Sequence, residues 1–177
     1  MTTHKEFTIP FSGLKVGAHS FEYQINNSFF ESFEYNEFNE ADISIKVHFN
    51  KTSTVMELEM EAQGTVNVAC DLTNEPFDLE VSGSLPLVVK FGEDYNDEDD
   101  EILVIPHGEH QFNIAQYIYE MLVLAVPQKR IHPGVEDGTL KSEALKKLEE
   151  LQPKESNNND NNTDPRWDAL KNLLTDK

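Results

Sequence analysis

Apolar and polar residues alternate one by one through most of the first hundred residues. Successive side chains of a β-strand point to opposite faces, so a period of two indicates strands with one buried and one wet face. Such strands favour antiparallel pairing, because strands of parallel sheets are usually apolar on both faces. The alternation covers residues 7–11, 21–25, 43–49, 56–62, 66–70, 77–81 and 85–91.

These segments and a further apolar strand at 102–105 predict a curved antiparallel sheet of about seven or eight strands. Polar turn residues at Asn50-Lys51 and Gln63-Gly64 are expected to separate neighbouring strands. Alternation alone leaves open whether the sheet closes into a partial barrel.

One strong helical pattern runs from Asn113 to Val126, with apolar residues at helical spacing and Pro127 at its end. Asn113 and Gln116, three residues later, resemble a capping box. This helix is best placed to cover the dry face of the sheet, and a shorter helical turn is expected over 28–35. The fold class is therefore α+β.

The chain changes character beyond Pro133-Gly134. An amphipathic helix is expected at Leu140–Leu151, and a run of Asn residues follows that cannot bury a core. The expected organisation is a sheet-and-helix domain over 1–133, a charged amphipathic helix within 134–155, a flexible linker over 156–163 and a C-terminal docking helix over 164–177.

The C-terminal segment reads as a short helix that must dock on something. Asp164 is a good N-cap, and Pro165 falls at the first helical position, where its missing N–H costs nothing. Trp167, Leu170 and Leu174 then share one face. Helices shorter than about 12 residues are marginal alone in water, so this one is expected to dock on its own domain or on another molecule.

The chain is strongly acidic, with 14 Lys and Arg against 33 Asp and Glu and a net charge of −19. Such a charge repels phosphate backbones and attracts basic proteins, ribosomal proteins among them. A simpler interpretation, that the charge only keeps the protein in solution, stays open beside it. Seven of the nine residues of Glu93–Glu101, which we name the acidic run, are acidic.

The acidic run is expected to be an extended, solvated loop. It is either a plain solvated loop or, in the functional interpretation that we prefer, a contact surface for a basic partner. With the C-terminal segment, it supplies the candidate partner-binding residues. These are Asp94, Asp97, Glu98, Asp99, Asp100 and Glu101 in the run, and Asp164, Pro165, Arg166, Trp167, Leu170 and Leu174 at the C-terminus.

One basic island, at Lys129 and Arg130, offers an alternative site for direct contact with RNA, which Lys141, Lys146 and Lys147 could extend. The two cations also suit the end of the preceding helix, where they would stabilise its dipole. No aromatic residues for base stacking lie beside them.

The single cysteine, Cys70, is in phase with Val66 and Val68 and is expected to be buried and structural. A nucleophilic cysteine needs exposure and a base or cation beside it, whereas Cys70 precedes Asp71. A hydrolase or redox enzyme using Cys70 is the remaining catalytic alternative. No cofactor, metal-ligand set or other catalytic group is recognised, so we expect a protein that is not an enzyme.

The composition also bears on location. One cysteine allows no intramolecular disulfide, and neither a signal peptide nor an apolar stretch of about 20 residues is recognisable. The expected location is the cytoplasm.

Several segments in the same order resemble the YceD family, described as large ribosomal RNA subunit accumulation proteins. The most specific is Asp164-Pro165-Arg166-Trp167 with its following leucines. The others are Ile9–Leu14, the strand Gly64–Asp71, the acidic stretch Asp97–Glu101 with the strand after it, and the helix end Leu122–Pro127.

The resemblance implies a non-catalytic role in the synthesis, processing or stability of large-subunit ribosomal RNA. Many members carry a second cysteine soon after the first, where this chain has Asp71-Leu72-Thr73, and a cysteine cluster in the region where it has Ile131–Asn162 and no cysteine. A zinc site of such members is therefore not carried over. We expect an accessory factor of ribosome biogenesis whose acidic surface binds a basic ribosomal protein or assembly factor, with Trp167 as an apolar anchor.

Overall fold

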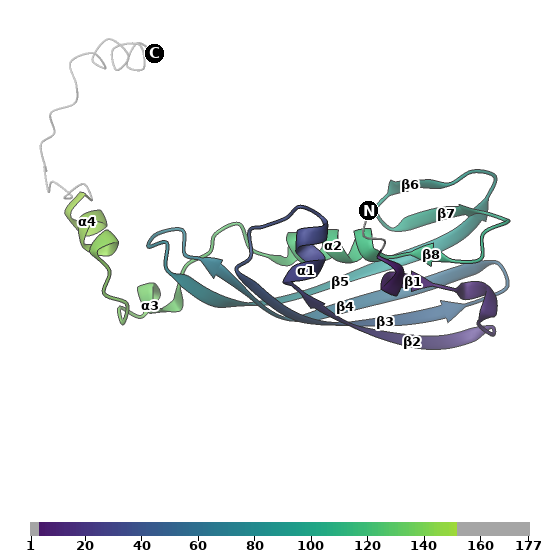
Figure 1. Cartoon of the computed structure of the whole chain (residues 1–177), viewed down its shortest axis with the longest axis horizontal. Coiled ribbons are helices and arrows are strands. Elements are labelled where there is room, and N and C mark those ends of the chain that lie inside the picture. The colour runs from purple at the N-terminus through teal and green to yellow at the C-terminus, as the bar shows by residue number, and fades with distance from the viewer. Residues whose placement is uncertain (1–3, 152–177) are drawn as a thin grey trace, which may run out of the picture. The chain divides into compact units, whose positions relative to one another are not determined.

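The computed structural model describes residues 4–151. The chain divides into two compact units, Met1–Lys141 and Ser142–Lys177, and each is described by itself. Every described strand belongs to the first unit (Figure 1).

Four long strands form an antiparallel meander in which each strand pairs with the next. The period-two alternation predicted them, and their burial alternates accordingly. Their inward residues form the core with the helices that cover this face. The strands are β2 (Gly17–Asn26), β3 (Glu40–Lys51), β4 (Val55–Ala69) and β5 (Pro76–Gly92).

Two further strands, β6 (Asn96–Asp99) and β7 (Ile102–Pro106), complete a six-stranded sheet of order β2-β3-β4-β5-β7-β6. The prediction of a purely antiparallel sheet was wrong at β5–β7, which pair in parallel. The acidic run doubles back after β5 as β6, and β7 then returns between them.

The main sheet is open, with β2 and β6 as its edges, so it does not form a partial barrel. Its six strands are fewer than the expected seven or eight. The other two described strands, β1 (Thr8–Ile9) and β8 (Phe112–Asn113), form a separate antiparallel pair.

The turn predicted at Asn50-Lys51 begins just after these residues, which are the last two of β3, and the turn predicted at Gln63-Gly64 was wrong, because β4 runs through it. Lys51 is still paired with Met56, and the turn is closed by Thr52, whose backbone N–H donates to the Val55 carbonyl at 2.9 Å. Gly64 lies within β4, opposite Ile43 on one side and Val81 on the other.

Gly64 is explained by the close approach of two backbones. A Cβ placed there would lie 2.6 Å from the Ile43 Cα and closer still to the Asp42 carbonyl oxygen. The glycine therefore permits tight pairing of β3 and β4 rather than a turn.

Helices α1 (Asn27–Ser32) and α2 (Ala115–Ala125) lie on the same side of the sheet (Figure 1). The Asn26 side chain caps α1 by accepting from the Ser28 backbone N–H at 3.1 Å. Helix α2 packs closely on β5 at Gly83, where an added Cβ would lie only 3.3 Å from the Ala125 Cβ. Two 3₁₀ turns, Lys5–Phe7 and Phe11–Gly13, bring Phe7 and Phe11 into the core.

The capping box predicted at the start of α2 is only half present. The Asn113 side-chain oxygen accepts from the Ala115 N–H at 2.9 Å. Gln116, which should reach back, instead donates to the Glu120 carboxylate at 2.7 Å. Helix α2 begins two residues later and ends one residue earlier than predicted.

Beyond α2, the helix α3 (Pro133–Glu136) spans the predicted boundary at 133 and belongs to the first unit. In the second unit, α4 (Glu143–Leu151) occupies most of the helix expected at Leu140–Leu151. The predicted linker at 156–163 and docking helix at 164–177 lie outside the described residues. No helix within residues 4–151 is both long and apolar enough to cross a membrane.

Candidate functional site

The acidic run is exposed along its whole length and forms an edge of the sheet. The Glu101 carbonyl accepts from the Val88 backbone N–H at 2.8 Å, which fastens the end of the run to β5. The Asn96 side chain accepts from the Glu98 N–H, and Asp99 accepts from the Glu101 N–H, at 2.9 and 3.0 Å. The run is therefore an ordered edge strand and turn, where a solvated loop was expected.

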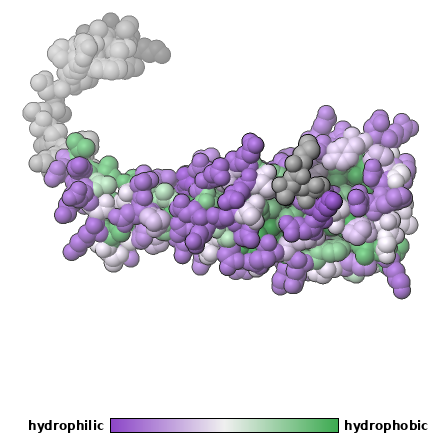
Figure 2. Space-filling model, in the orientation of Figure 1, coloured by the Kyte–Doolittle hydropathy of each residue, from purple (hydrophilic) through white to green (hydrophobic). Residues whose placement is uncertain are grey.

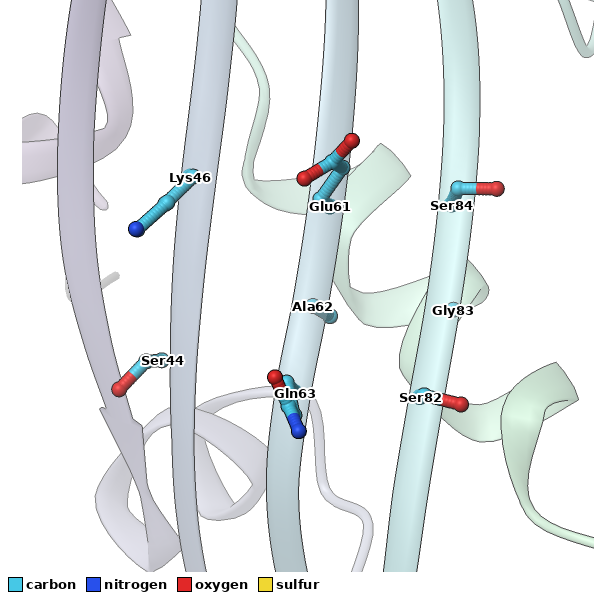
Figure 3. Close-up of a pocket in the computed structure, with 8 residues that line it drawn as sticks. All are labelled: Ser44, Lys46, Glu61, Ala62, Gln63, Ser82, Gly83 and Ser84. Carbon is cyan, nitrogen blue, oxygen red and sulfur yellow. The ribbon is translucent and has the colours of Figure 1, made fainter.

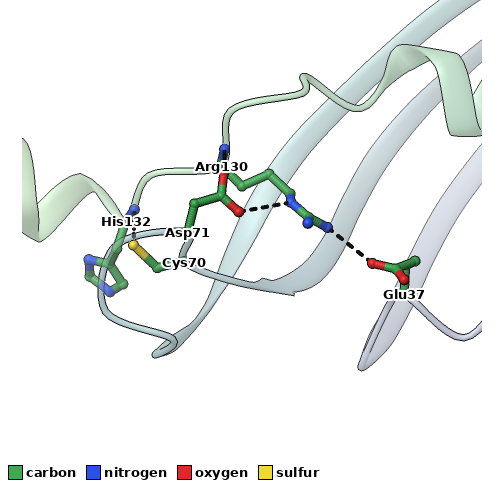
Figure 4. Close-up of polar contacts among 5 residues, drawn as sticks. All are labelled: Glu37, Cys70, Asp71, Arg130 and His132. Carbon is green, nitrogen blue, oxygen red and sulfur yellow. Dashed lines mark hydrogen bonds and ion pairs between the residues drawn. The ribbon is translucent and has the colours of Figure 1, made fainter. Parts of the chain in front are cut away.

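The carboxylates of the acidic run form no ion pair with any described cation. Both ion pairs within residues 4–151 belong to Arg130, whose guanidinium lies 3.6 Å from Asp71 and 3.7 Å from Glu37 (Figure 4). Figure 2 shows hydrophilic residues over most of the visible surface of the described chain. The run is a concentrated negative charge available to a cationic partner.

The end of the run and the outer face of α2 line a cavity of about 560 Å³, which we name the acidic groove. Its side chains are both apolar and acidic, and Leu124 at its wall is 83% exposed. Residues that line the groove include Leu85, Asp100, Glu101, Glu120, Val123 and Leu124.

Tyr117 lies on α2, one turn before Met121, and only 7% of its surface is exposed. Its hydroxyl is buried and has no hydrogen-bond partner among the described residues. Burial raises the pKa of Tyr117 to about 12, and the nearby groups of Tyr95, Asp97, Glu120 and Asp100 add to the rise. The phenol is thus held neutral beside the acidic run.

Replacing Tyr117 with phenylalanine is expected to stabilise the protein by about 1 kcal/mol, because a buried hydroxyl without a partner costs free energy. The raised pKa means that the folded state holds the phenolic proton more tightly than the unfolded state does. The stability that comes from this difference in pKa is therefore fully present below pH 10. It is lost as the pH rises from 10 towards about 12, because the unfolded state gives up the phenolic proton first.

Urea unfolding of both proteins between neutral pH and pH 11 measures these effects. Tyr117→Phe should lose less stability than the wild type above pH 10. Tyr119→Phe is the matched control, because Tyr119 is only half-buried and its ring would keep its stacking on Phe33. A Tyr117→Phe protein less stable than the wild type at neutral pH would contradict the interpretation.

The cationic residues of the basic island differ in their exposure and in the unit to which they belong. Lys129 is exposed, whereas Arg130 is half-buried and its backbone N–H also donates to the Asp71 carboxylate at 2.7 Å. Lys141 is exposed at the end of the first unit, while Lys146 and Lys147 are exposed on α4 in the second. Arg130 therefore serves to fasten the chain after α2 to the loop after β4.

Cys70 lies in the same region and is buried, with 2% of its surface exposed, as the alternation predicted. The His132 backbone N–H donates to its Sγ at 3.3 Å (Figure 4). Burial raises the pKa of the thiol, but this donor and others from Leu72 and Thr73 outweigh burial and lower the pKa below its ordinary value. The thiol thus accepts one hydrogen bond that joins this loop to the chain after α2.

A second cavity, of about 630 Å³, lies on the uncovered face of the sheet. Figure 3 shows Lys46, Glu61 and Ser84 on three neighbouring strands, and Lys46 is directly opposite Glu61 in the register. Sequence analysis did not single out these residues, although they are the polar half of the same alternation. Among the described residues, no three His, Cys, Asp or Glu side chains are placed to hold a metal ion.

Three comparisons with known proteins complete the description. A family model described as "Large ribosomal RNA subunit accumulation protein YceD" matches residues 58–174 of the 177. No curated protein and no solved structure matches the chain. The match begins within β4 and includes Cys70, the acidic run and α2. From the order of its motifs and from this match, the chain belongs to the YceD family.

Proposed function

We propose that this protein is a non-catalytic accessory factor in the biogenesis of the large ribosomal subunit. In this role it binds a basic ribosomal protein or assembly factor in the cytoplasm, and it thereby supports the accumulation of large-subunit RNA. The family description supports the ribosomal setting. The observation that carries the mode of action is the acidic run, whose exposed carboxylates have no cation partner within residues 4–151.

A protein partner explains the charge better than RNA does. Ribosomal proteins are basic, and a surface of opposite charge speeds their encounter with this chain and discriminates against other partners. Direct contact with RNA would have to overcome a net charge of −19. The Arg130 side chain of the basic island is already paired with Asp71 and Glu37.

The C-terminal segment has a part in this proposal. Trp167, Leu170 and Leu174 would add an apolar anchor to the electrostatic attraction. These residues lie outside the described residues, so the role rests on their helical spacing in the sequence.

Capture of partners from a cell lysate tests the proposal. The wild-type protein should retain basic proteins of the large subunit, and treatment with nuclease should leave them bound. Neutralising three carboxylates of the run, as Asp97→Asn, Glu98→Gln and Asp99→Asn together, should lower the amount captured about tenfold, because charges at an interface mainly set encounter and selectivity.

The matched control changes the net charge by the same amount at another place on the protein. Glu57→Gln, Glu59→Gln and Glu61→Gln together neutralise the outward side chains of β4, on the face away from α2. This control should capture partners as the wild type does. Capture that disappears with nuclease would mean that RNA bridges the partners, and it would overturn the proposed binding of a protein.

A further inference from the structure

We infer that the acidic groove is a docking site for a cationic amphipathic helix of a protein partner. The apolar side of that helix would lie on Leu85, Val123 and Leu124, and its Lys or Arg residues would face Asp100, Glu101 and Glu120. The inference rests on the proposed function for the kind of partner, and it adds the place and the form in which the partner binds.

The apolar part of the groove lies on the outer face of a helix whose opposite face is already used. Ile118 and Leu122 point into the core and are almost fully buried. Leu124 is 83% exposed on the outer face, and Val123 is half-buried beside it. A single exposed leucine would be ordinary, but Leu124 is grouped with Val123 and Leu85 along one cavity, and such grouping favours a contact surface.

The charged part of the groove comes from two separate elements. Asp100 and Glu101 precede β7, and Glu120 projects from α2, yet all three line the same cavity. None of the three is in an ion pair with a described cation. Because like charges repel, three carboxylates gathered here favour a ligand that brings positive charge.

Tyr117 lies on α2 behind the groove and is not one of its lining residues. Its hydroxyl is buried without a hydrogen bond among the described residues, one helical turn before Glu120 and Met121. Asp100 and Glu120, which line the groove, also act electrostatically on this phenol. The negative charge at the groove wall therefore acts on a buried group beside it as well as on a ligand.

The combination of leucine and carboxylate favours a helix over a bound metal ion or a stretch of polylysine. Metal ions gain nothing from apolar walls, and a polycation without apolar residues leaves Leu124 in water. An amphipathic helix with apolar residues at positions i, i+3, i+4 and i+7 along one stripe matches both features of the groove.

Binding of synthetic peptides to the full-length protein tests the inference. The first probe is a fluorescent Leu/Lys peptide of about 16 residues with leucines at helical spacing, long enough to form a helix when bound. A permuted peptide of identical composition, whose leucines lie on all sides, is the second probe. Fluorescence anisotropy should give an affinity for the first about tenfold tighter than for the second.

Two groove variants should each weaken binding of the first peptide about tenfold, since central anchors and the charges around them carry most of the binding energy. One is Leu124→Ser, a change at an exposed position that leaves the core intact. The other combines Asp100→Asn, Glu101→Gln and Glu120→Gln. The β4 variant with Glu57→Gln, Glu59→Gln and Glu61→Gln has the same net charge as this second groove variant, and it should bind the peptide as the wild type does.

Three results would overturn the inference. Equal binding of the two peptides, or equal loss in the groove and β4 variants, would show attraction by charge alone, and the proposed function would still stand. A peptide of residues 164–177 that occupies the groove more tightly would assign it to the chain's own C-terminus. Specific peptide binding without any capture of ribosomal proteins would instead support the groove as a docking site and reject the proposed function.

Discussion

Replacing Gly64 with alanine is expected to destabilise the protein by about 3 kcal/mol or more, because the added Cβ collides with backbone atoms. That Cβ would lie 2.6 Å from the Ile43 Cα and nearer to the Asp42 carbonyl oxygen. A flexible side chain could move aside at low cost, but the backbone of β3 is held by its pairing with β2 and β4. The substitution must therefore separate two central strands or distort both.

The free energy of unfolding in urea measures this loss. Gly108→Ala is the matched control, because a Cβ there has no atom within 4 Å and the residue is exposed. The control should stay within about 0.5 kcal/mol of the wild type, as expected for a surface substitution. A Gly64→Ala protein of unchanged stability would contradict the close approach of β3 and β4 at this position.

Truncating Phe30 to alanine is expected to cost about 4 kcal/mol, in the range for a fully buried aromatic residue. Phe30 is 2% exposed and packs edge-on against Phe38 at 4.9 Å and Phe29 at 5.5 Å between ring centroids. Its removal would leave a cavity where α1 meets the sheet, and the surrounding rings can fill it only in part.

Phe33, at the end of α1, is the comparison for this truncation. Its ring is half-buried and stacks on Tyr119 at 4.4 Å between ring centroids. Phe33→Ala should therefore cost about 1–2 kcal/mol, mostly through the lost aromatic contact. Equal losses at Phe30 and Phe33, measured by chemical unfolding, would contradict the burial that separates them.

The sequence predicted the strands well because alternation records which face of each strand is buried. The prediction from sequence failed where one residue type can serve two structural roles. Glycine marks many turns, but Gly64 is needed for close backbone pairing inside β4. The parallel pairing of β5 and β7 was missed although β7 carries a local signal for it, because residues 102–105 are apolar on both faces, as strands of parallel sheets usually are.

The candidate site was predictable in its charge and not in its shape. The acidic run stands out in the sequence because its acidic residues are consecutive. The groove brings Leu85, Glu101 and Leu124 together from β5, the end of the run and α2, and this depends on tertiary packing. Val123 and Leu124 gave a local signal, because they lie off the apolar stripe of their helix yet are not polar.

The position of β6 at the sheet edge gives the acidic run a protective effect that is independent of any partner. An edge strand offers unpaired backbone groups, which invite strands of other molecules to add and begin aggregation. Two molecules meeting at β6 would bring exposed Asp97, Glu98 and Asp99 against their own copies, and repulsion would keep them apart. At the opposite edge, β2 has one acidic residue, Glu22. Intermolecular β-sheet growth in concentrated solutions at neutral pH should therefore start from β2, and acidification, which protonates the carboxylates of β6, should remove the protection of β6.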